Sequence, residues 1–134
     1  MGDPGEDEHQ VVVIGAACVD TKGQSLAPVV FGTSNPGEIR ITVGGVGRNI
    51  AEGLARQGVP VSFISAVGDD DWGRDIVRRT KRGGVDLHHL MVCKGERSAA
   101  YLAVLDENGE RLVSIDSTNI MRHINGRYLF DRRR

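Results

Sequence analysis

Runs of β-branched residues alternate along the chain with stretches in which apolar residues recur at helical spacing. Residues 11–15 (VVVIG) and 61–68 (VSFISAVG) are nearly continuous apolar runs, which predict core strands. Between them, Ile50 and Leu54 repeat at helical spacing and Gly58 supplies a stop signal. A second helical stretch covers residues 72–82. This alternation predicts an α/β fold built on a largely parallel sheet.

Two other regions favour antiparallel strands. Residues 29–31 and 39–43 are β-like runs joined by a turn, with no helical pattern between them. Residues 98–105 and 111–115 flank an Asn-Gly pair, which is the strongest short-range signal for a hairpin. We therefore expect a small β lid beside the main sheet, and a further helix that starts near Gly126.

A glycine-rich turn, residues 44–49 (GGVGRN), follows one of these runs and opens the first helix. Glycine allows backbone conformations that other residues avoid and lets a ligand approach the main chain closely. At the start of a helix, free N–H groups and the positive end of the dipole face outward. This turn is suited to a polar or anionic small molecule. The alternative is a tight turn in which glycine serves only close packing.

The turn does not match the two common nucleotide motifs. No Gly-x4-Gly-Lys-Ser/Thr run occurs in the chain. Gly45 and Gly47 fit the first two positions of a dinucleotide fingerprint, but Ile50 occupies the third. After the first strand, Ala17 stands where the second glycine would be. These mismatches count against a nucleotide-binding regulatory domain of Rossmann type.

Two charged or ligating clusters have simpler explanations than a metal site. The carboxylates of residues 69–71 precede the second helix, where Asp70 or Asp71 would cap it. His88 and His89 are adjacent, so in an extended segment they face opposite sides and do not share one metal.

Composition narrows the class of protein. The chain has 134 residues, the length of one domain, with 40% hydrophobic and 26% charged residues, as in soluble globular proteins. The net charge of −1 predicts no electrostatic attraction to nucleic acid or to a membrane. No apolar run approaches the ~20 residues of a membrane span.

The N-terminus and the cysteines indicate the compartment. Residues 1–10 are acidic and contain glycine and proline, so we expect a short disordered tail, unlike a secretory or mitochondrial leader. Cys18 and Cys93 form no CxxC pair, which favours free thiols in a reducing compartment. We therefore expect a cytoplasmic protein.

Taken in order, these motifs resemble the ribokinase-like (PfkB) carbohydrate kinases. Residues 44–49 look like the family's first signature, a turn that opens a helix beneath the sugar site. The strand at 11–15, the run 61–70 (VSFISAVGDD) with its Val-Gly-Asp turn, and the hairpin at 101–110 (YLAVLDENGE) follow in family order. The resemblance covers roughly residues 11–128. It implies a doubly wound, ribokinase-like sheet, here incomplete, with a small β lid.

The resemblance implies a kinase that transfers the γ-phosphate of ATP, with Mg²⁺, to a hydroxyl of a sugar or nucleoside. Asp20 would accept hydrogen bonds from vicinal hydroxyls, and Asn49 would offer a donor and acceptors to the same ring. Gly44 and Gly45 would let the sugar sit against the backbone. Asn35 completes the expected substrate-binding set. Its run 33–37 (TSNPG), with 44–49 and the hairpin, looks most like the pseudouridine-kinase branch.

Two departures from the family pattern change what is expected. Val46 stands where some family members carry lysine, which disfavours a plain ribokinase. Family members are about twice as long, and the second signature (Gly-Ala-Gly-Asp), with the catalytic base and the ATP pocket, does not occur here. We therefore expect residues 11–134 to be the N-terminal, substrate-binding part of a truncated kinase, without catalytic or ATP-binding residues. The alternative is a non-catalytic fragment that binds a sugar or nucleoside, or that forms a homodimer through its lid.

Overall fold

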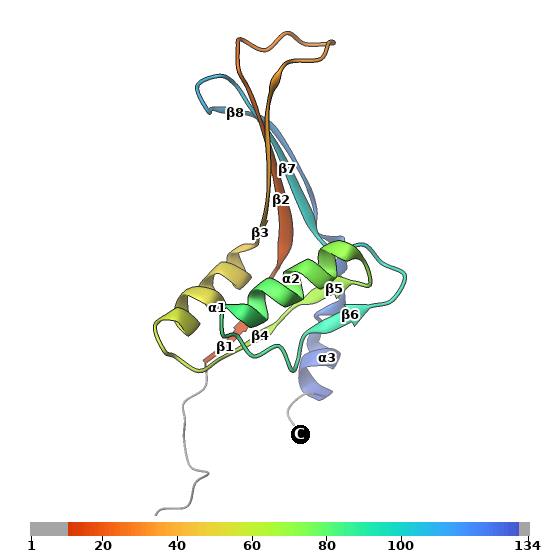
Figure 1. The fold of residues 1–134 in the computed structure, drawn as a ribbon. Coiled ribbons are helices and arrows are strands. Elements are labelled where there is room, and N and C mark those ends of the chain that lie inside the picture. Colours follow the sequence, from red (N-terminus) through yellow and green to blue (C-terminus); the bar gives the residue numbers. More distant parts are fainter. Residues whose placement is uncertain (1–10, 132–134) are drawn as a thin grey trace, which may run out of the picture.

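The computed structural model describes residues 11–131 (Figure 1). The tail expected over residues 1–10 lies outside this range. The described elements are, in chain order, β1 (Val11–Ile14), β2 (Cys18–Ser25), β3 (Gly37–Gly44), α1 (Val46–Arg56), β4 (Val61–Ile64), β5 (Ala66–Gly68), α2 (Asp71–Arg82), β6 (Met91–Cys93), β7 (Ala100–Leu105), β8 (Arg111–Ser117), the 3-10 helix η1 (Asn119–His123) and α3 (Gly126–Asp131).

The core strands pair in parallel, as the sequence predicts. β1 pairs with β4, and β5 pairs with β6. The expected strand over residues 61–68 is divided at Ser65, because β4 and β5 have different neighbours. The Ser65 carbonyl accepts a hydrogen bond from the N–H of Met91 at 2.9 Å, which leads the chain from one pairing to the next.

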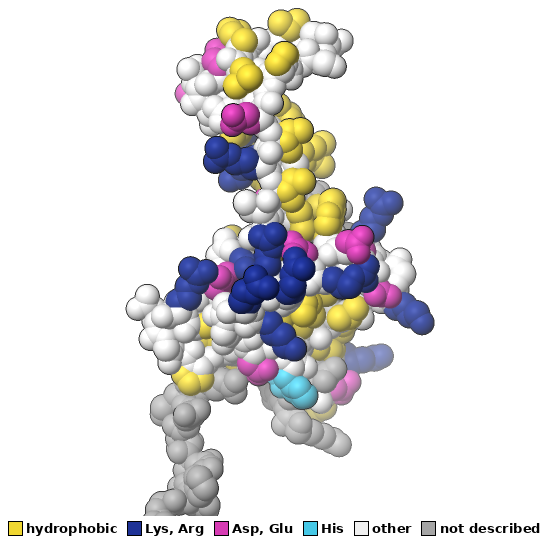
Figure 2. Space-filling view, in the orientation of Figure 1, with side chains coloured by type: hydrophobic (Ala, Val, Ile, Leu, Met, Phe, Trp, Pro, Cys, Tyr) yellow, Lys and Arg dark blue, Asp and Glu magenta, His cyan; other side chains and the backbone are white. Residues whose placement is uncertain are grey.

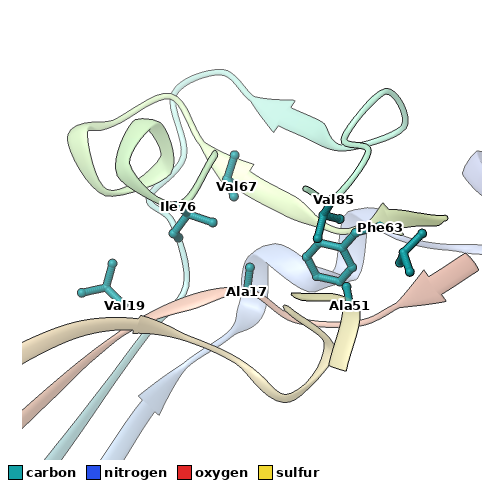
Figure 3. Packing of buried hydrophobic residues seen from close by; sticks show 8 residues of the cluster. Ala17, Val19, Ala51, Phe63, Val67, Ile76 and Val85 are labelled. Carbon is teal, nitrogen blue, oxygen red and sulfur yellow. The ribbon is translucent and has the colours of Figure 1, made fainter. Parts of the chain in front are cut away.

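The two long helices pack on these strands. Phe63 of β4 is fully buried and lies near Ala51 of α1 and Val85 (Figure 3). Ile76 of α2 is also fully buried in the same cluster. In α1, Ala51 and Leu54 face the core, whereas Ile50, which the helical spacing also selected, is 51% exposed. No helix in the described part of the chain is long and apolar enough to cross a membrane.

The predicted lid is a single four-stranded sheet, which we call the lid sheet, with the order β3-β2-β7-β8. It extends away from the core as a narrow blade (Figure 1). β2 and β3 are antiparallel, β2 and β7 are parallel, and β7 and β8 are antiparallel. The parallel β2–β7 pairing joins what the sequence presents as two separate antiparallel pairs.

One lid strand was predicted wrongly. Residues 29–31 form no strand, and the partner of β3 is β2, which runs from Cys18 opposite Gly44 to Ser25 opposite Gly37. Polar residues and a glycine interrupt β2, so its own sequence carries a weak strand signal. Pairing on both sides, with β3 and with β7, supplies the stabilisation that local propensity lacks.

The hairpin and the last helix are confirmed. The Asp106 carboxylate accepts hydrogen bonds from the N–H groups of Asn108 (2.9 Å) and Glu110 (2.8 Å) between β7 and β8. Gly109 takes a φ of 82°, a conformation that suits glycine. α3 begins at Gly126, where the sequence predicts a helix.

Candidate functional site

The glycine-rich turn packs tightly against the connection between β1 and β2. Gly45 has a φ of 100°, and a Cβ on it would lie 2.4 Å from the carbonyl oxygen of Ala16. A Cβ on Gly47 would lie 2.8 Å from the Cα of Gly15. Close packing therefore requires glycine at both positions. This does not exclude a ligand-binding role, because the same packing brings the start of α1 to the base of the lid sheet.

Asp20 lies beside this turn. A Cβ on Gly44 would lie 2.3 Å from Oδ2 of Asp20, so the carboxylate occupies the space that a side chain at position 44 would need. The thiol of Cys18 donates to Oδ1 of Asp20 at 3.1 Å. Burial, followed by this hydrogen bond, raises the pKa of Cys18 to about 12. Cys18 therefore remains a neutral donor, and the structure brings Asp20, Gly44 and Gly45 together.

Asp20 follows the first core strand in the sequence and is itself part of a strand, β2 of the lid sheet. It lies opposite Thr42 of β3 and Tyr101 of β7. Pairing with two neighbouring strands holds the carboxylate more firmly than a loop would.

Asn49 lies in the first turn of α1. Its N–H donates to the carbonyl of Gly45 at 2.9 Å, and its side chain is exposed. The Oδ1 atom accepts from Nη1 of Arg48 at 3.5 Å. Asn49 is therefore at the same helix end as the glycines, with an amide that is accessible from solvent.

Arg48 is a residue of this turn whose role the sequence analysis missed. It is 6% exposed. Its Nε donates to Oγ1 of Thr80 at 2.9 Å, its Nη1 donates to the carbonyl of Val43 at 3.2 Å, and its Nη2 pairs with Glu52 at 2.8 Å. Arg48 thus connects α1, α2 and the last part of β3. The available signal was the i, i+4 spacing of Arg48 and Glu52, which suggests an ion pair but not its burial.

Asn35 is placed apart from the other candidate residues. It lies in the connection between β2 and β3, which begins after Ser25, the last residue of β2. Its Oδ1 accepts from the N–H of Val30 at 2.8 Å, and its Nδ2 donates to the carbonyls of Val30 (3.0 Å) and Thr33 (3.2 Å). The run from Asp20 to Ser25, at about 3.3 Å per residue, separates Asn35 from the carboxylate site. Its amide holds this connection together.

The carboxylates before α2 include the expected helix cap. Oδ1 of Asp70 accepts from the N–H of Gly73 at 2.7 Å and from the hydroxyl of Ser98 at 2.6 Å, while Oδ2 accepts from the N–H of Ser98 at 2.8 Å. Burial opposes ionisation of Asp70, but these hydrogen bonds outweigh it and hold the pKa of the carboxyl below its usual value. Asp70 therefore caps α2 and anchors the segment that leads into β7.

The fold and this site define an α/β protein in which a glycine-opened helix and a carboxylate meet at the base of a β lid. The family model for the pfkB family of carbohydrate kinases matches residues 8–125. The chain belongs to this family.

Individual relatives agree with that assignment. The chain is 41% identical to the pseudouridine kinase of Escherichia coli (strain K12) over 123 residues, which cover 92% of this chain and 39% of that enzyme. It is 36% identical to the guanosine-inosine kinase of Exiguobacterium acetylicum over 107 residues, covering 80% of this chain and 35% of that enzyme.

The fold is similar to that of solved kinases. The crystal structure of a candidate sugar kinase from Clostridium perfringens matches 96% of this chain and 40% of its own, with a TM-score of 0.83 and 38% identity. The chain therefore spans about two fifths of the length of these relatives.

The glycine-rich turn does not fit the nucleotide that the family implies. Within residues 11–131, no three His, Cys, Asp or Glu side chains gather as a metal site. At the glycine-rich turn, the N–H of Arg48 already donates to the carbonyl of Ala16 at 3.2 Å, and the carboxylate of Asp20 lies against Gly44. A negative charge at this place does not suit a phosphate. We assign neither ATP nor Mg²⁺ to these residues.

Proposed function

We propose that the chain is the substrate-binding part of a kinase that transfers the γ-phosphate of ATP to a hydroxyl of a sugar or nucleoside. The observation that carries this proposal is the Asp20 carboxylate held against Gly44 at the start of α1. A carboxylate accepts hydrogen bonds from two neighbouring hydroxyls, and charge-assisted bonds of this kind are stronger than neutral ones. Asn49, with an exposed amide at the same helix end, would complete the hydroxyl contacts.

The roles of these residues are to bind and orient the acceptor. We assign Asp20 the role of holding ring hydroxyls, with its Oδ1 held in place by the thiol of Cys18. Fixing the acceptor hydroxyl in one orientation is itself a large part of catalysis in phosphoryl transfer. The γ-phosphate donor, Mg²⁺ and the catalytic base would come from outside the described residues.

We also propose a cytoplasmic location. Cys18 and Cys93 are both free thiols, which is typical of proteins in a reducing compartment.

Pseudouridine is the acceptor we propose first. The proposal is supported by the 41% identity to a pseudouridine kinase and the 36% identity to a guanosine-inosine kinase, which both act on nucleosides by name.

A second role, in dimer formation, is favoured by one face of the lid sheet. The strand register aligns apolar side chains from β3, β7 and β8 in two rows across this face, which we call the apolar lid face. Figure 2 shows hydrophobic side chains gathered along this part of the molecule. The apolar lid face consists of Ile39, Ile41, Leu102, Val104, Val113 and Ile115, of which all except Val104 are exposed.

We propose that a second copy of the chain covers the apolar lid face. The blade extends away from the core, so core elements do not cover this face (Figure 1). The face carries no charged side chain, so two copies related by a two-fold axis could cover each other's apolar side chains without burying a charge. This role is compatible with substrate binding, because Asp20 projects from the opposite face of the same sheet.

Calorimetric titration of the chain with pseudouridine and with ribose tests the proposed function. We expect both to bind, and Asp20→Ala and Asn49→Ala to weaken binding about 5- to 150-fold each, the effect of losing a hydrogen bond worth about 1–3 kcal/mol. Glu107→Ala, an exposed carboxylate in the hairpin loop, is the matched control and should bind like the wild type. Binding that is unchanged in both site variants would show that Asp20 and Asn49 do not hold the acceptor.

A further inference from the structure

A hollow lined by arginines lies where the last turn of α2 meets α1. We call it the arginine hollow, and its lining residues are Arg48, Glu52 and Arg56 of α1, Arg79 and Arg82 of α2, and Gly83. None of the residues that we propose to bind the acceptor lines it. Figure 2 shows Lys and Arg side chains gathered on the face of the molecule that carries α1 and α2.

The arginine hollow carries an excess of positive charge, because four arginines and one carboxylate line it. That carboxylate is already shared, since Glu52 pairs with Nη2 of Arg48 at 2.8 Å and with Nη2 of Arg56 at 2.6 Å. Among the ion pairs of residues 11–131, none includes Arg82. The hollow therefore has guanidinium groups whose charge the described residues do not balance.

The end of α2 does not require these arginines as caps. An arginine near the C-terminus of a helix can bond the last carbonyl groups. Here the carbonyls of Arg79 and Lys81 accept from the N–H groups of Gly83 (3.1 Å) and Gly84 (3.0 Å) instead. The backbone thus satisfies these carbonyls, and the guanidinium N–H groups of Arg82 remain available to a ligand.

Gly83 keeps the floor of the hollow open. Its φ of −71° and ψ of −1° are angles that any residue adopts, so the backbone does not require glycine here. A Cβ at this position would lie 2.9 Å from Cγ of Glu52. Glycine therefore leaves Glu52 the room to pair with both arginines of α1. A carboxylate paired twice repels an anion in the hollow less than a free one would.

We propose that the arginine hollow binds a phosphate group, either inorganic or carried by a small molecule. Guanidinium N–H groups form a planar fork that matches the oxygens of phosphate. Arg56 approaches from α1, whereas Arg79 and Arg82 approach from α2, so a ligand with oxygens in more than one plane contacts both helices. A tetrahedral phosphate has this shape and a planar carboxylate does not. No aromatic side chain lines the hollow, which disfavours a nucleic-acid strand with stacked bases.

Calorimetric titration with inorganic phosphate, pyrophosphate and ribose 5-phosphate tests the proposal. We expect Arg82→Gln and Arg79→Gln each to weaken binding about 10- to 150-fold, the effect of losing hydrogen bonds to a charged group. Lys81→Gln removes the same charge from an exposed position that does not line the hollow, so this matched control should bind like the wild type. Asp20→Ala should also bind normally, because the acceptor site is separate.

The three ligands distinguish the source of the phosphate. Tighter binding of inorganic phosphate or pyrophosphate would identify a free anion as the ligand, and tighter binding of ribose 5-phosphate would identify an ester. A folded wild-type chain that binds none of the three would overturn the proposal.

Two further results would also overturn it. Equal losses in Arg82→Gln and Lys81→Gln would mean that positive charge attracts anions over the whole surface, and a DNA oligonucleotide that binds more tightly than pyrophosphate would then assign this surface to nucleic acid. Loss of ribose 5-phosphate binding in Asp20→Ala but not in Arg82→Gln would place that ligand in the acceptor site.

Discussion

At the scale of single residues, the GGVGRN turn serves packing and the candidate site at once. Gly45 and Gly47 are needed because the backbone of residues 15–17 lies too close for any Cβ. Gly44 is needed for a different reason, since the group beside it is the carboxylate of Asp20. Substitution at position 44 should therefore affect the site before it affects the fold.

Gly44→Ala tests this distinction. The added Cβ would lie 2.3 Å from Oδ2 of Asp20, so we expect the carboxylate to rotate away and ligand affinity to fall to the level of Asp20→Ala. The matched control is Gly53→Ala in α1, where an added Cβ meets nothing within 4 Å. This control should gain about 0.5–1 kcal/mol in free energy of unfolding, because alanine is the better helix former. Denaturant titration and calorimetry measure the two effects, and normal ligand binding by Gly44→Ala would contradict the prediction.

Arg48 and Arg56 offer a second comparison, because both pair with Glu52. The exposed fractions of their side chains are 8% for Arg48 and 71% for Arg56. Arg48→Met removes the buried donor to Thr80 and to the carbonyl of Val43, while Glu52 keeps Arg56, and should lower the free energy of unfolding by about 1–3 kcal/mol. Arg56→Met removes a solvated ion pair and should lower it by about 0–1 kcal/mol. If urea denaturation shows similar losses in free energy of unfolding for the two variants, the burial of Arg48 does not contribute to stability.

At the scale of elements, α2 depends on contacts outside its own sequence. Asp70 caps its first turn and also binds both the N–H and the hydroxyl of Ser98, just before β7. The N–H of Gly68 donates in turn to the hydroxyl of Ser98 at 2.9 Å. The cap therefore joins β5, α2 and the lid sheet, and its protonation state matters to all three.

The stability of the chain should consequently depend on Asp70 at acid pH. The pKa of Asp70 is lower in the folded state than in the unfolded state. The ionised carboxylate therefore stabilises the fold at pH values above its unfolded-state pKa of about 3.9. This stabilisation is lost as the pH falls through the folded-state pKa. We expect Asp70→Ala to lower the free energy of unfolding by about 0.5–2 kcal/mol at pH 7. The difference from the wild type should shrink below about pH 4. Asp71→Ala, whose side chain is 96% exposed, is the control and should follow the wild type. Urea midpoints measured from neutral to acid pH give the stability of each variant as a function of pH. A difference between Asp70→Ala and the wild type that stays constant with pH would refute the role of the Asp70 charge.

At the scale of the whole molecule, the lid sheet has two different faces. The polar face carries Asp20 and Tyr101, and the opposite one is the apolar lid face. Each exposed valine or isoleucine there forgoes about 1.5–3 kcal/mol of burial. For a domain whose net stability is only ~5–15 kcal/mol, covering this face is a substantial gain.

The chain should therefore associate in solution through this face. We expect sedimentation velocity to show a dimer or larger species, and Ile41→Lys with Ile115→Lys to shift it to the monomer, because each lysine places a charge in the apolar contact. Arg40→Glu with Ser114→Glu, on the polar face of the same two strands, is the matched control and should leave association unchanged. A wild-type chain that sediments as a monomer, with a sharp cooperative thermal transition above about 50 °C, would contradict the proposal.

Local patterns in the sequence determined the elements whose causes are local. The helical spacing around Ile50 and Leu54 placed α1, the Asn-Gly pair placed the β7–β8 turn, and the carboxylates at positions 70 and 71 placed the start of α2. In each case the sequence signal comes from residues only a few positions apart, such as Asp70, whose Oδ1 accepts from the N–H of Gly73. The grouping of Asp20 with the glycine-rich turn was also expected, from the order of the motifs.

Only the tertiary structure decided the rest, since it depends on partners that are distant in the sequence. β2 is a strand because β3 and β7 pair with it, whereas its own polar composition does not predict a strand. The same pairing sets Tyr101 beside Asp20, and the packing of α1 on α2 buries Arg48 against Thr80. Turn chemistry and hydrophobic periodicity depend on residues that are close together along the chain. Strand register and side-chain burial depend on contacts between segments that are far apart in the sequence.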